Sequence, residues 1–142
     1  ADYLRNNPTQ QVAKPSQSSW GYKGFHEYWL NETNAWIYPH LHKAAERMIE
    51  LAKREPEDEL QWRALNQAAR ELLLAQSSDW AVIMRTGTKA PDAVRRTRSH
   101  LSRFTKLWED LNEGKVDSGW LVKVEAIDNI FPNINYRVYR PL

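Results

Sequence analysis

Two tryptophans nine residues apart, Trp20 and Trp29, are the side chains of this sequence best suited to bind a ligand. They lie in a stretch, SSWGYKGFHEYW, that is too rich in glycine and large aromatics for a regular helix and too irregular for a strand. An indole offers a flat, rigid, apolar face, which matches the apolar C–H face of a sugar ring. Neighbouring glycines allow an irregular loop to present such rings at a surface. We therefore predict that Trp20 and Trp29 contact a carbohydrate, and the alternative is that they fill the core, as we expect for Trp36.

A polar cluster at residues 76–80 (QSSDW) interrupts a long apolar helical pattern. Serine and aspartate are poor residues for a helix interior because their side chains compete for backbone hydrogen bonds. The cluster therefore either caps a second helical segment or presents hydroxyls and a carboxylate to a ligand.

The sequence lacks the common signatures of catalytic and metal sites. It contains no glycine-rich phosphate loop, no serine nucleophile elbow and no HExxH. His40 and His42 are two residues apart, so a helix would point them to different faces, which makes them a poor metal pair. There is no cysteine, so thiolate metal sites and disulfides are excluded. We expect neither a metal nor a cofactor.

A basic run at residues 95–106 (RRTRSHLSRFTK) could contact phosphates. Its apolar positions fall at helical spacing, so the arginines can occupy the solvated face of an ordinary helix. We favour this interpretation and predict no nucleic-acid partner. The alternative function is a helical module that binds a protein or a nucleic acid through the face from Arg95 to Lys106.

The composition is that of an ordinary globular domain, except for its seven tryptophans. With 142 residues the chain can form one domain with a real core. Its net charge is only +2, which does not by itself indicate nucleic acid or a membrane surface. No apolar run approaches the roughly 18 residues of a membrane span. We expect a cytoplasmic protein with no membrane partner.

Apolar residues recur at helical spacing through most of the chain, which predicts an all-α bundle of about four helices. We expect helices within residues 34–55, 57–87, 91–114 and from residue 117 or 118 to 127. Residues 1–19 are expected to form an extended lead-in, and the tail NIFPNINYRVYRPL an extended C-terminal strap. The predicted core residues are Ile37, Leu41, Ala44, Met48 and Leu51 or Ala52, then Leu60, Leu65, Ala68, Leu72, Leu73 and Ile83, then Val94, Leu101, Phe104, Leu107, Trp108 and Leu111, and finally Trp120, Leu121, Val124 and Ile127.

Capping residues support these boundaries. Asn34 is expected to cap the first helix, and Pro39 requires that this helix begins close to it or is kinked by it. Gly87 and Gly114 are expected as C-caps, and Pro91 suits a first turn.

Four blocks of the sequence resemble a known family. They are SSWGYKGFHEYWLNETNAWIYPHLHKAAERM, LNQAARELLLAQSSDWAVIMRTGT, VRRTRSHLSRF and DNIFPNINYRVY. Together they resemble the C-terminal helical domain of the 1,4-α-glucan branching enzymes of glycoside hydrolase family 57. The resemblance extends over nearly the whole chain, from about Tyr3 onward.

The resemblance implies a partner and a site. Such a domain follows a distorted (β/α)7 catalytic barrel in the same chain and completes one wall of its α-glucan-binding cleft. Residues 1–19 would lead in from that barrel, and residues 20–142 would form the helical domain. Trp20 and Trp29 match positions that stack on glucose units, and we expect Ser78 and Asp79 at the same cleft.

The family's reaction cleaves an α-1,4 bond and transfers the freed segment to a 6-hydroxyl with retention. Its Glu nucleophile and Asp acid/base belong to barrel motifs that have no counterpart in this sequence. We therefore expect no catalytic residue in this chain, and no activity from it alone.

Overall fold

The computed structural model describes residues 2–8 and 12–141, and within them it contains helices and no β-strand. The prediction of an all-α fold is confirmed. The α-helices are α1 (Asp2–Asn6), α2 (Ile37–Ala52), α3 (Glu59–Ala75), α4 (Ser78–Thr86), α5 (Ala90–Glu113) and α6 (Ser118–Ile127), and two short 3-10 helices are η1 (Tyr22–Gly24) and η2 (Tyr136–Tyr139). Of the helices described, none has the length and apolar character that a membrane span requires.

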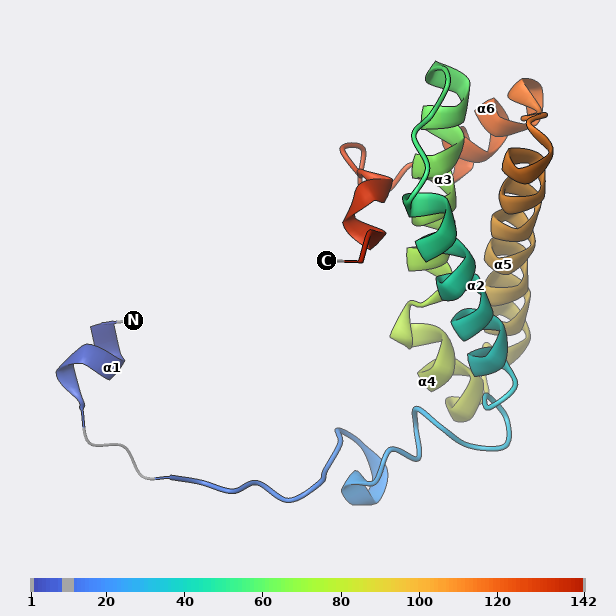
Figure 1. The fold of residues 1–142 in the computed structure, drawn as a ribbon. Helices are drawn as coiled ribbons and strands as arrows, with labels where there is room; N and C mark the ends of the chain where they lie inside the picture. The colour runs from blue at the N-terminus through green and yellow to red at the C-terminus, as the bar shows by residue number, and fades with distance from the viewer. Residues whose placement is uncertain (1, 9–11, 142) are drawn as a thin grey trace.

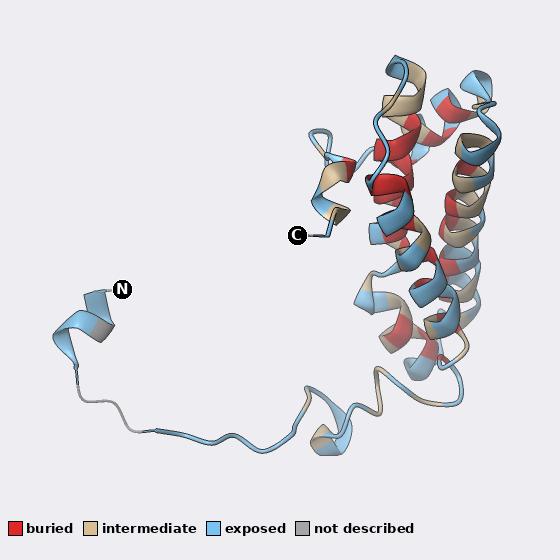
Figure 2. Cartoon of the chain, in the orientation of Figure 1, coloured by how far each residue is buried: buried red, intermediate tan, exposed pale blue. Residues whose placement is uncertain are grey.

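The bundle is built around α3, which packs against α2, α5, α6 and η2. Helices α2, α3 and α5 lie side by side, α4 lies near the start of α2, and α6 lies at the opposite end (Figure 1). Buried residues gather on the sides of the helices that face one another (Figure 2). The main core consists of Ala44, Met48, Leu51, Ala52, Ala64, Leu65, Ala68, Ala69, Leu72, Phe104, Leu107, Leu121 and Tyr136.

Local chemistry explains where the helices begin and end. Asp58 caps α3 by accepting a hydrogen bond from the Gln61 amide at 2.7 Å, and Asp117 caps α6 in the same way. Gly87 and Gly114 end α4 and α5 with positive φ angles of 98° and 65°, which confirms them as C-caps. Pro91 lies in the first turn of α5, as predicted.

The first helix agrees closely with its predicted pattern. All the predicted core positions of α2, including both Leu51 and Ala52, are buried. Helix α2 begins at Ile37, so Pro39 falls in the first turn, where its missing N–H has little cost. Asn34 is not the side-chain cap that we expected, since no side chain caps α2.

Three details differ from the simplest expectation. The helical region expected over residues 57–87 is divided into two helices, since α3 ends at Ala75 and α4 begins at Ser78, as one of the two interpretations of the polar cluster at residues 76–80 required. Leu73 and Ile127, both predicted to be core residues, are exposed because they lie on the outward faces of α3 and α6. The lead-in, expected to be extended, contains the short helix α1.

The strap, of which the structure describes residues 129–141, is anchored across the α2–α3 connection. Tyr136 is fully buried, and its hydroxyl donates a hydrogen bond to the Arg54 carbonyl at 2.8 Å. Its amide donates to the side-chain oxygen of Asn66 at 2.9 Å. Arg137 and Arg140 both pair with Glu55. The strap therefore closes one side of the bundle without forming a strand.

Candidate functional site

Trp20 presents its ring at the surface of the loop that precedes α2. The residue is 71% exposed, and its ring packs against the rings of Tyr28 and Trp29, with centroid separations of 5.7 and 6.3 Å. Trp29 is half-buried and packs against a second apolar cluster, formed where α2, the end of α3, α4 and α5 meet. This cluster consists of Ile37, Leu41, Ala75, Ala81, Met84 and Ala93. The two predicted tryptophans are thus brought together, one exposed and one partly embedded. We call Trp20, Tyr28 and Trp29 the aromatic platform.

Gly21 is what allows the platform to form. Its φ angle is 103°, and a Cβ at this position would lie 2.1 Å from Cδ2 of Tyr28. A side chain here would displace the Tyr28 ring, which Trp20 already covers. The glycine is therefore required both by its backbone conformation and by close contact.

The loop is fixed to the bundle through Asn34, which is fully buried. Its amide nitrogen donates hydrogen bonds to the carbonyls of Tyr28 at 3.0 Å and Ala81 at 3.1 Å. Its side-chain oxygen accepts a hydrogen bond from the backbone N–H of Asn31 at 2.9 Å. The Tyr38 hydroxyl also donates to the Trp29 carbonyl. Asn34 thus ties the aromatic platform to α4.

Ser78 and Asp79 occupy the first turn of α4 and are exposed. Their side chains form no hydrogen bond or ion pair with any residue that the structure describes, so both are available to a ligand. No such bond joins either of them to Trp20 or Trp29. The polar cluster at residues 76–80 does mark the start of a second helical segment, as one of our two interpretations required.

A second polar cluster, which the sequence analysis missed, lies inside the bundle. It consists of Glu71 on α3, His100 on α5 and Asp128 after α6, all buried. His100 Nδ1 lies 2.8 Å from Glu71 Oε2 and 3.6 Å from Asp128 Oδ2. Arg103 pairs with Asp128, and Gln67 donates to Glu71 at 3.0 Å. These contacts satisfy charges that would otherwise be costly to bury.

The chemistry of this buried cluster is dominated by desolvation. Burial raises the pKa of Glu71, while the hydrogen bond from His100 acts in the opposite direction. The three side chains could each offer one metal ligand, since their ligand atoms lie within 4.8 Å of one another. A cation would have to compete with the Arg103 guanidinium for Asp128. We therefore interpret the cluster as a buried polar network that joins three elements of the bundle.

A periodic signal could have revealed two members of this network. His100 continues the buried stripe of α5, in which Ala93, Thr97 and Phe104 are the neighbouring positions at helical spacing. Glu71 falls on the buried stripe of α3 in the same way. A titratable residue on a core stripe indicates a buried partner on a facing element.

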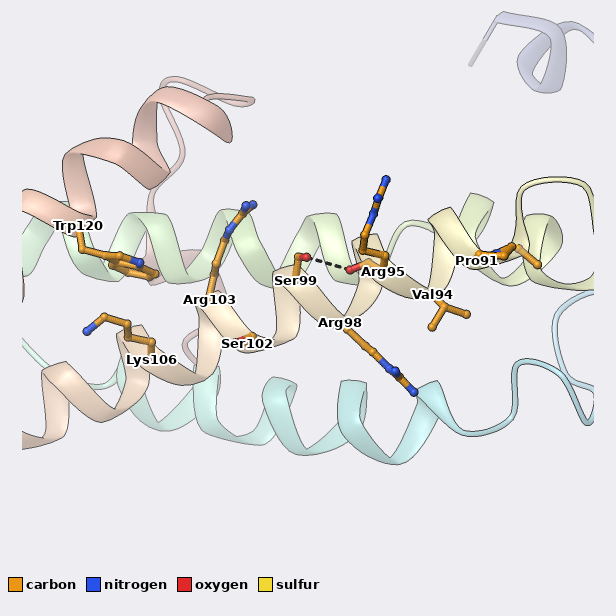
Figure 3. A pocket seen from close by; sticks show the side chains of 10 residues that line it. Pro91, Val94, Arg95, Arg98, Ser99, Ser102, Arg103, Lys106 and Trp120 are labelled. Carbon is orange, nitrogen blue, oxygen red and sulfur yellow. Dashed lines mark hydrogen bonds between the residues drawn. The ribbon is translucent and has the colours of Figure 1, made fainter.

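The basic run forms one side of a surface groove of about 920 Å³ along α5 (Figure 3). Trp120 of α6 lies at one end of this groove and Pro91 at the other. Ser99 and Ser102 lie between them on the same helix. The groove is lined by Ala90, Pro91, Val94, Arg95, Arg98, Ser99, Ser102, Arg103, Lys106 and Trp120.

Most of the positive charge in this groove is already paired. Arg95 pairs with Asp92 at 2.7 Å, and Lys106 pairs with Asp110 at 2.9 Å. Arg103 pairs with Asp128, and the Arg98 guanidinium lies 5.2 Å from the ring centroid of Trp36. These pairings leave fewer unpaired cations for phosphate than the basic run in the sequence suggested.

Comparison with known proteins supplies the family. The sequence model described as "1,4-alpha-glucan branching enzyme, C-terminal" matches residues 40–139. The 1,4-alpha-glucan branching enzyme TK1436 of Thermococcus kodakarensis is 36% identical over 120 residues, which cover 81% of this chain and 18% of that protein. The chain thus spans about a fifth of the curated relative that it matches.

Solved structures show the same relationship. The α-amylase AmyC of Thermotoga maritima is 43% identical with a TM-score of 0.78, and the match covers 100% of this chain and 26% of that chain. A GH57-type branching enzyme of Pyrococcus horikoshii is 34% identical with a TM-score of 0.84, and the match covers 99% of this chain and 28% of that chain. The structure of TK1436 in complex with glucose and additives is 30% identical with a TM-score of 0.84, and the match covers 99% of this chain and 27% of that chain. The resemblance noted from the sequence is confirmed, and the chain belongs to the C-terminal domain family of the 1,4-α-glucan branching enzymes.

Proposed function

We propose that this chain forms one wall of the α-glucan-binding cleft of a branching enzyme whose catalytic carboxyls lie on another domain. In this proposal residues 1–19 lead in from a (β/α)7 catalytic barrel, and residues 20–142 form the helical domain that covers it. The whole protein would transfer α-1,4-linked segments to 6-hydroxyls with retention.

The observation that carries the proposal is the exposed aromatic platform. A core tryptophan would be buried, whereas Trp20 is 71% exposed although a second indole and a phenol ring lie beside it. Exposed, rigid aromatic rings with polar neighbours are typical of ligand-binding surfaces. Glucose units have apolar faces that such rings can cover, and TK1436 was solved with glucose.

Ser78 and Asp79 would add hydrogen bonds to the sugar hydroxyls. Both are exposed, and their side chains have no partner among the described residues. The carboxylate of Asp79 can only accept hydrogen bonds, whereas the hydroxyl of Ser78 can also donate. This pair therefore suits neutral, hydroxyl-rich ligands.

The chain alone is expected to be inactive. Retaining glycosidases need two carboxyls about 5–5.5 Å apart that reach the scissile bond. The carboxyls of Glu71 and Asp128 lie close together, but Glu71 is fully buried and cannot reach a glucan. New α-1,6 linkages after incubation of this chain with amylose, detected by debranching and chain-length analysis, would contradict the proposal.

Binding is tested by titrating isotope-labelled chain with maltohexaose and following its indole N–H signals by NMR. A ring face that buries about 100 Å² at about 25 cal/mol per Å² contributes about 2.5 kcal/mol. Trp20→Ala and Trp29→Ala should therefore each weaken binding about sixtyfold, which makes a millimolar affinity too weak to measure.

The matched control is Trp120→Ala, which removes a partly exposed indole from the groove along α5. It should leave maltohexaose binding unchanged, and added salt should have little effect. Loss of binding in Trp120→Ala with no loss in Trp20→Ala would move the site to the groove. Binding that falls steeply with salt would instead favour the basic face of residues 95–106.

A further inference from the structure

A small cavity lies directly beside the aromatic platform. It measures about 270 Å³ and lies between the tryptophan loop and the end of α4. The loop supplies Tyr22, Glu27 and Tyr28, and α4 supplies Arg85 and Thr86. Tyr28 lines this cavity and its ring packs against Trp20, so the cavity adjoins the platform.

The two walls of the cavity are joined by a hydrogen bond. Asn34 donates it to the Ala81 carbonyl, as described above, and the Thr33 hydroxyl, which donates to Asn31 Oδ1, lies 3.5 Å from the Met84 carbonyl oxygen. The residue that follows Met84 is Arg85, which lines the cavity. The cavity therefore exists because the tryptophan loop is docked against α4, and it does not depend on the position of one mobile surface side chain.

Glu27, which lines this cavity, has one buried carboxylate oxygen without a partner among the described residues. Its Oε2 is inaccessible to solvent and accepts no hydrogen bond from any described residue. Buried polar atoms in folded proteins are nearly always hydrogen-bonded, and leaving one unpaired is costly. A ligand in the cavity cannot reach Oε2, but the other carboxylate oxygen, Oε1, is not buried and has no donor among the described residues, so the carboxylate can accept a hydrogen bond from a ligand through Oε1.

Arg85 supplies the complementary group. Its side chain forms no hydrogen bond or ion pair with another described residue, although Glu27 lines the same cavity. Thr86 donates its hydroxyl hydrogen to the Val82 carbonyl at 3.1 Å, which leaves its oxygen able to accept. A carboxylate only accepts and a guanidinium only donates, so a group between them must do both. Hydroxyl groups on adjacent carbons of a sugar meet this requirement.

We propose that this cavity is a subsite for one glucose unit of the α-glucan, with Glu27 and Arg85 binding neighbouring hydroxyls of that unit. The inference rests on the proposed function, because it extends the chain of sugars from Trp20 past Tyr28. Pockets for drug-sized ligands measure about 300–1,000 Å³, so a cavity just below this range suits a single ring. Tyr22 and Tyr28 provide apolar walls on which that ring can pack.

The test uses maltohexaose titrations of Glu27→Gln and Arg85→Gln, followed by NMR. Each variant removes a charge-assisted hydrogen bond, so each should weaken binding about tenfold. The controls are Glu32→Gln, an exposed glutamate of the same loop, and Arg96→Gln, an exposed arginine of α5. Both controls should remain within about twofold of the unmodified chain. In the unmodified chain, maltohexaose should also shift the amide signals of Arg85 and Thr86, which tests the subsite without any substitution.

The outcomes separate this inference from the function on which it rests. If Trp20→Ala loses binding while Glu27→Gln and Arg85→Gln do not, the subsite is wrong and the platform stands. If maltohexaose does not bind, or binds independently of Trp20 and Trp29, both proposals fail. If inorganic phosphate shifts the Arg85 and Thr86 signals and displaces maltohexaose from them, the cavity is an anion site and the inference is overturned.

Discussion

Replacing Asn34 by alanine should loosen the tryptophan loop and destabilise the bundle together. The substitution removes three hydrogen bonds at once: those to the carbonyls of Tyr28 and Ala81, and the one from the Asn31 amide. The Asn34 side chain is fully buried, and its bond to Ala81 crosses 47 positions of sequence. Its loss is therefore a tertiary effect and not a local one.

The magnitude follows from the three bonds. Each contributes about 0.5–1.5 kcal/mol net, so the loss of all three costs about 1.5–4.5 kcal/mol of unfolding free energy. That is a large part of a typical total of about 5–15 kcal/mol. With a urea dependence of about 2 kcal/mol per molar, the unfolding midpoint should fall by about 1–2 M.

Urea unfolding followed by far-UV circular dichroism measures the bundle, and near-UV circular dichroism measures the packing of the aromatic platform. Both signals should change at one midpoint, which should be lower in Asn34→Ala. Asn34→Asp should be at least as damaging, because it turns a carboxylate oxygen toward two carbonyl oxygens. Asn133→Ala, at an exposed asparagine of the strap, is the matched control and should behave as the unmodified chain.

Two results would refute this reasoning. An unchanged midpoint in Asn34→Ala would mean that the three bonds contribute nothing net. Loss of the near-UV signal at an unchanged far-UV midpoint would mean that the loop detaches without affecting the bundle, so the platform is not coupled to α4.

Three further substitutions test other parts of the structure. Gly21→Ala should displace the Tyr28 ring and reduce the near-UV signal, and an unaltered spectrum would contradict the close contact at this glycine. Because burial raises the pKa of Glu71 in the folded chain, the fold binds that proton more tightly than the unfolded chain does. Stability should therefore decline as pH rises above about 4, the ordinary pKa of a glutamate, and Glu71→Gln should flatten this decline in urea titrations at several pH values. Trp80→Phe removes the indole hydrogen bond to the Leu74 carbonyl at 2.7 Å and should lower the unfolding free energy by about 1–2 kcal/mol, whereas an unchanged value would show that water replaces the bond.

The helical framework was predictable because its signals are local. The spacing from Ile37 to Leu51 identified the buried face of α2 correctly, and the glycines that end α4 and α5 marked real C-caps. The prediction that Leu73 is buried was wrong because Leu73 lies beside Leu72 in an apolar run. Spacing alone does not tell which of two neighbouring leucines faces the core. Only the positions of the helices that pack on α3 decide that question.

The site was predictable in kind but not in geometry. Glycine and aromatic content indicated that the tryptophan loop is irregular, yet the exposure of Trp20 depends on how Asn34 attaches that loop to α4. Helical spacing marks Glu71 and His100 each as buried, but they lie 29 positions apart on two helices, so no local pattern shows that they pair with each other. No contact joins Ser78 or Asp79 to Trp20 in the structure, so their place in one glucan-binding cleft remains a prediction.

The strap has a consequence for the order in which the chain folds. Tyr136 is a core residue whose hydroxyl donates a hydrogen bond to the Arg54 carbonyl, and it follows Arg54 by 82 positions in the sequence. At a synthesis rate of about 5–20 residues per second, roughly 4–16 s separate the appearance of these two residues during translation. Over that interval the space beside Trp62, where the Tyr136 ring comes to lie, is open to water and to other nascent chains. Long-range closure of this kind slows folding and exposes apolar surface to aggregation, so a chain stalled before residue 136 should be a preferred chaperone substrate.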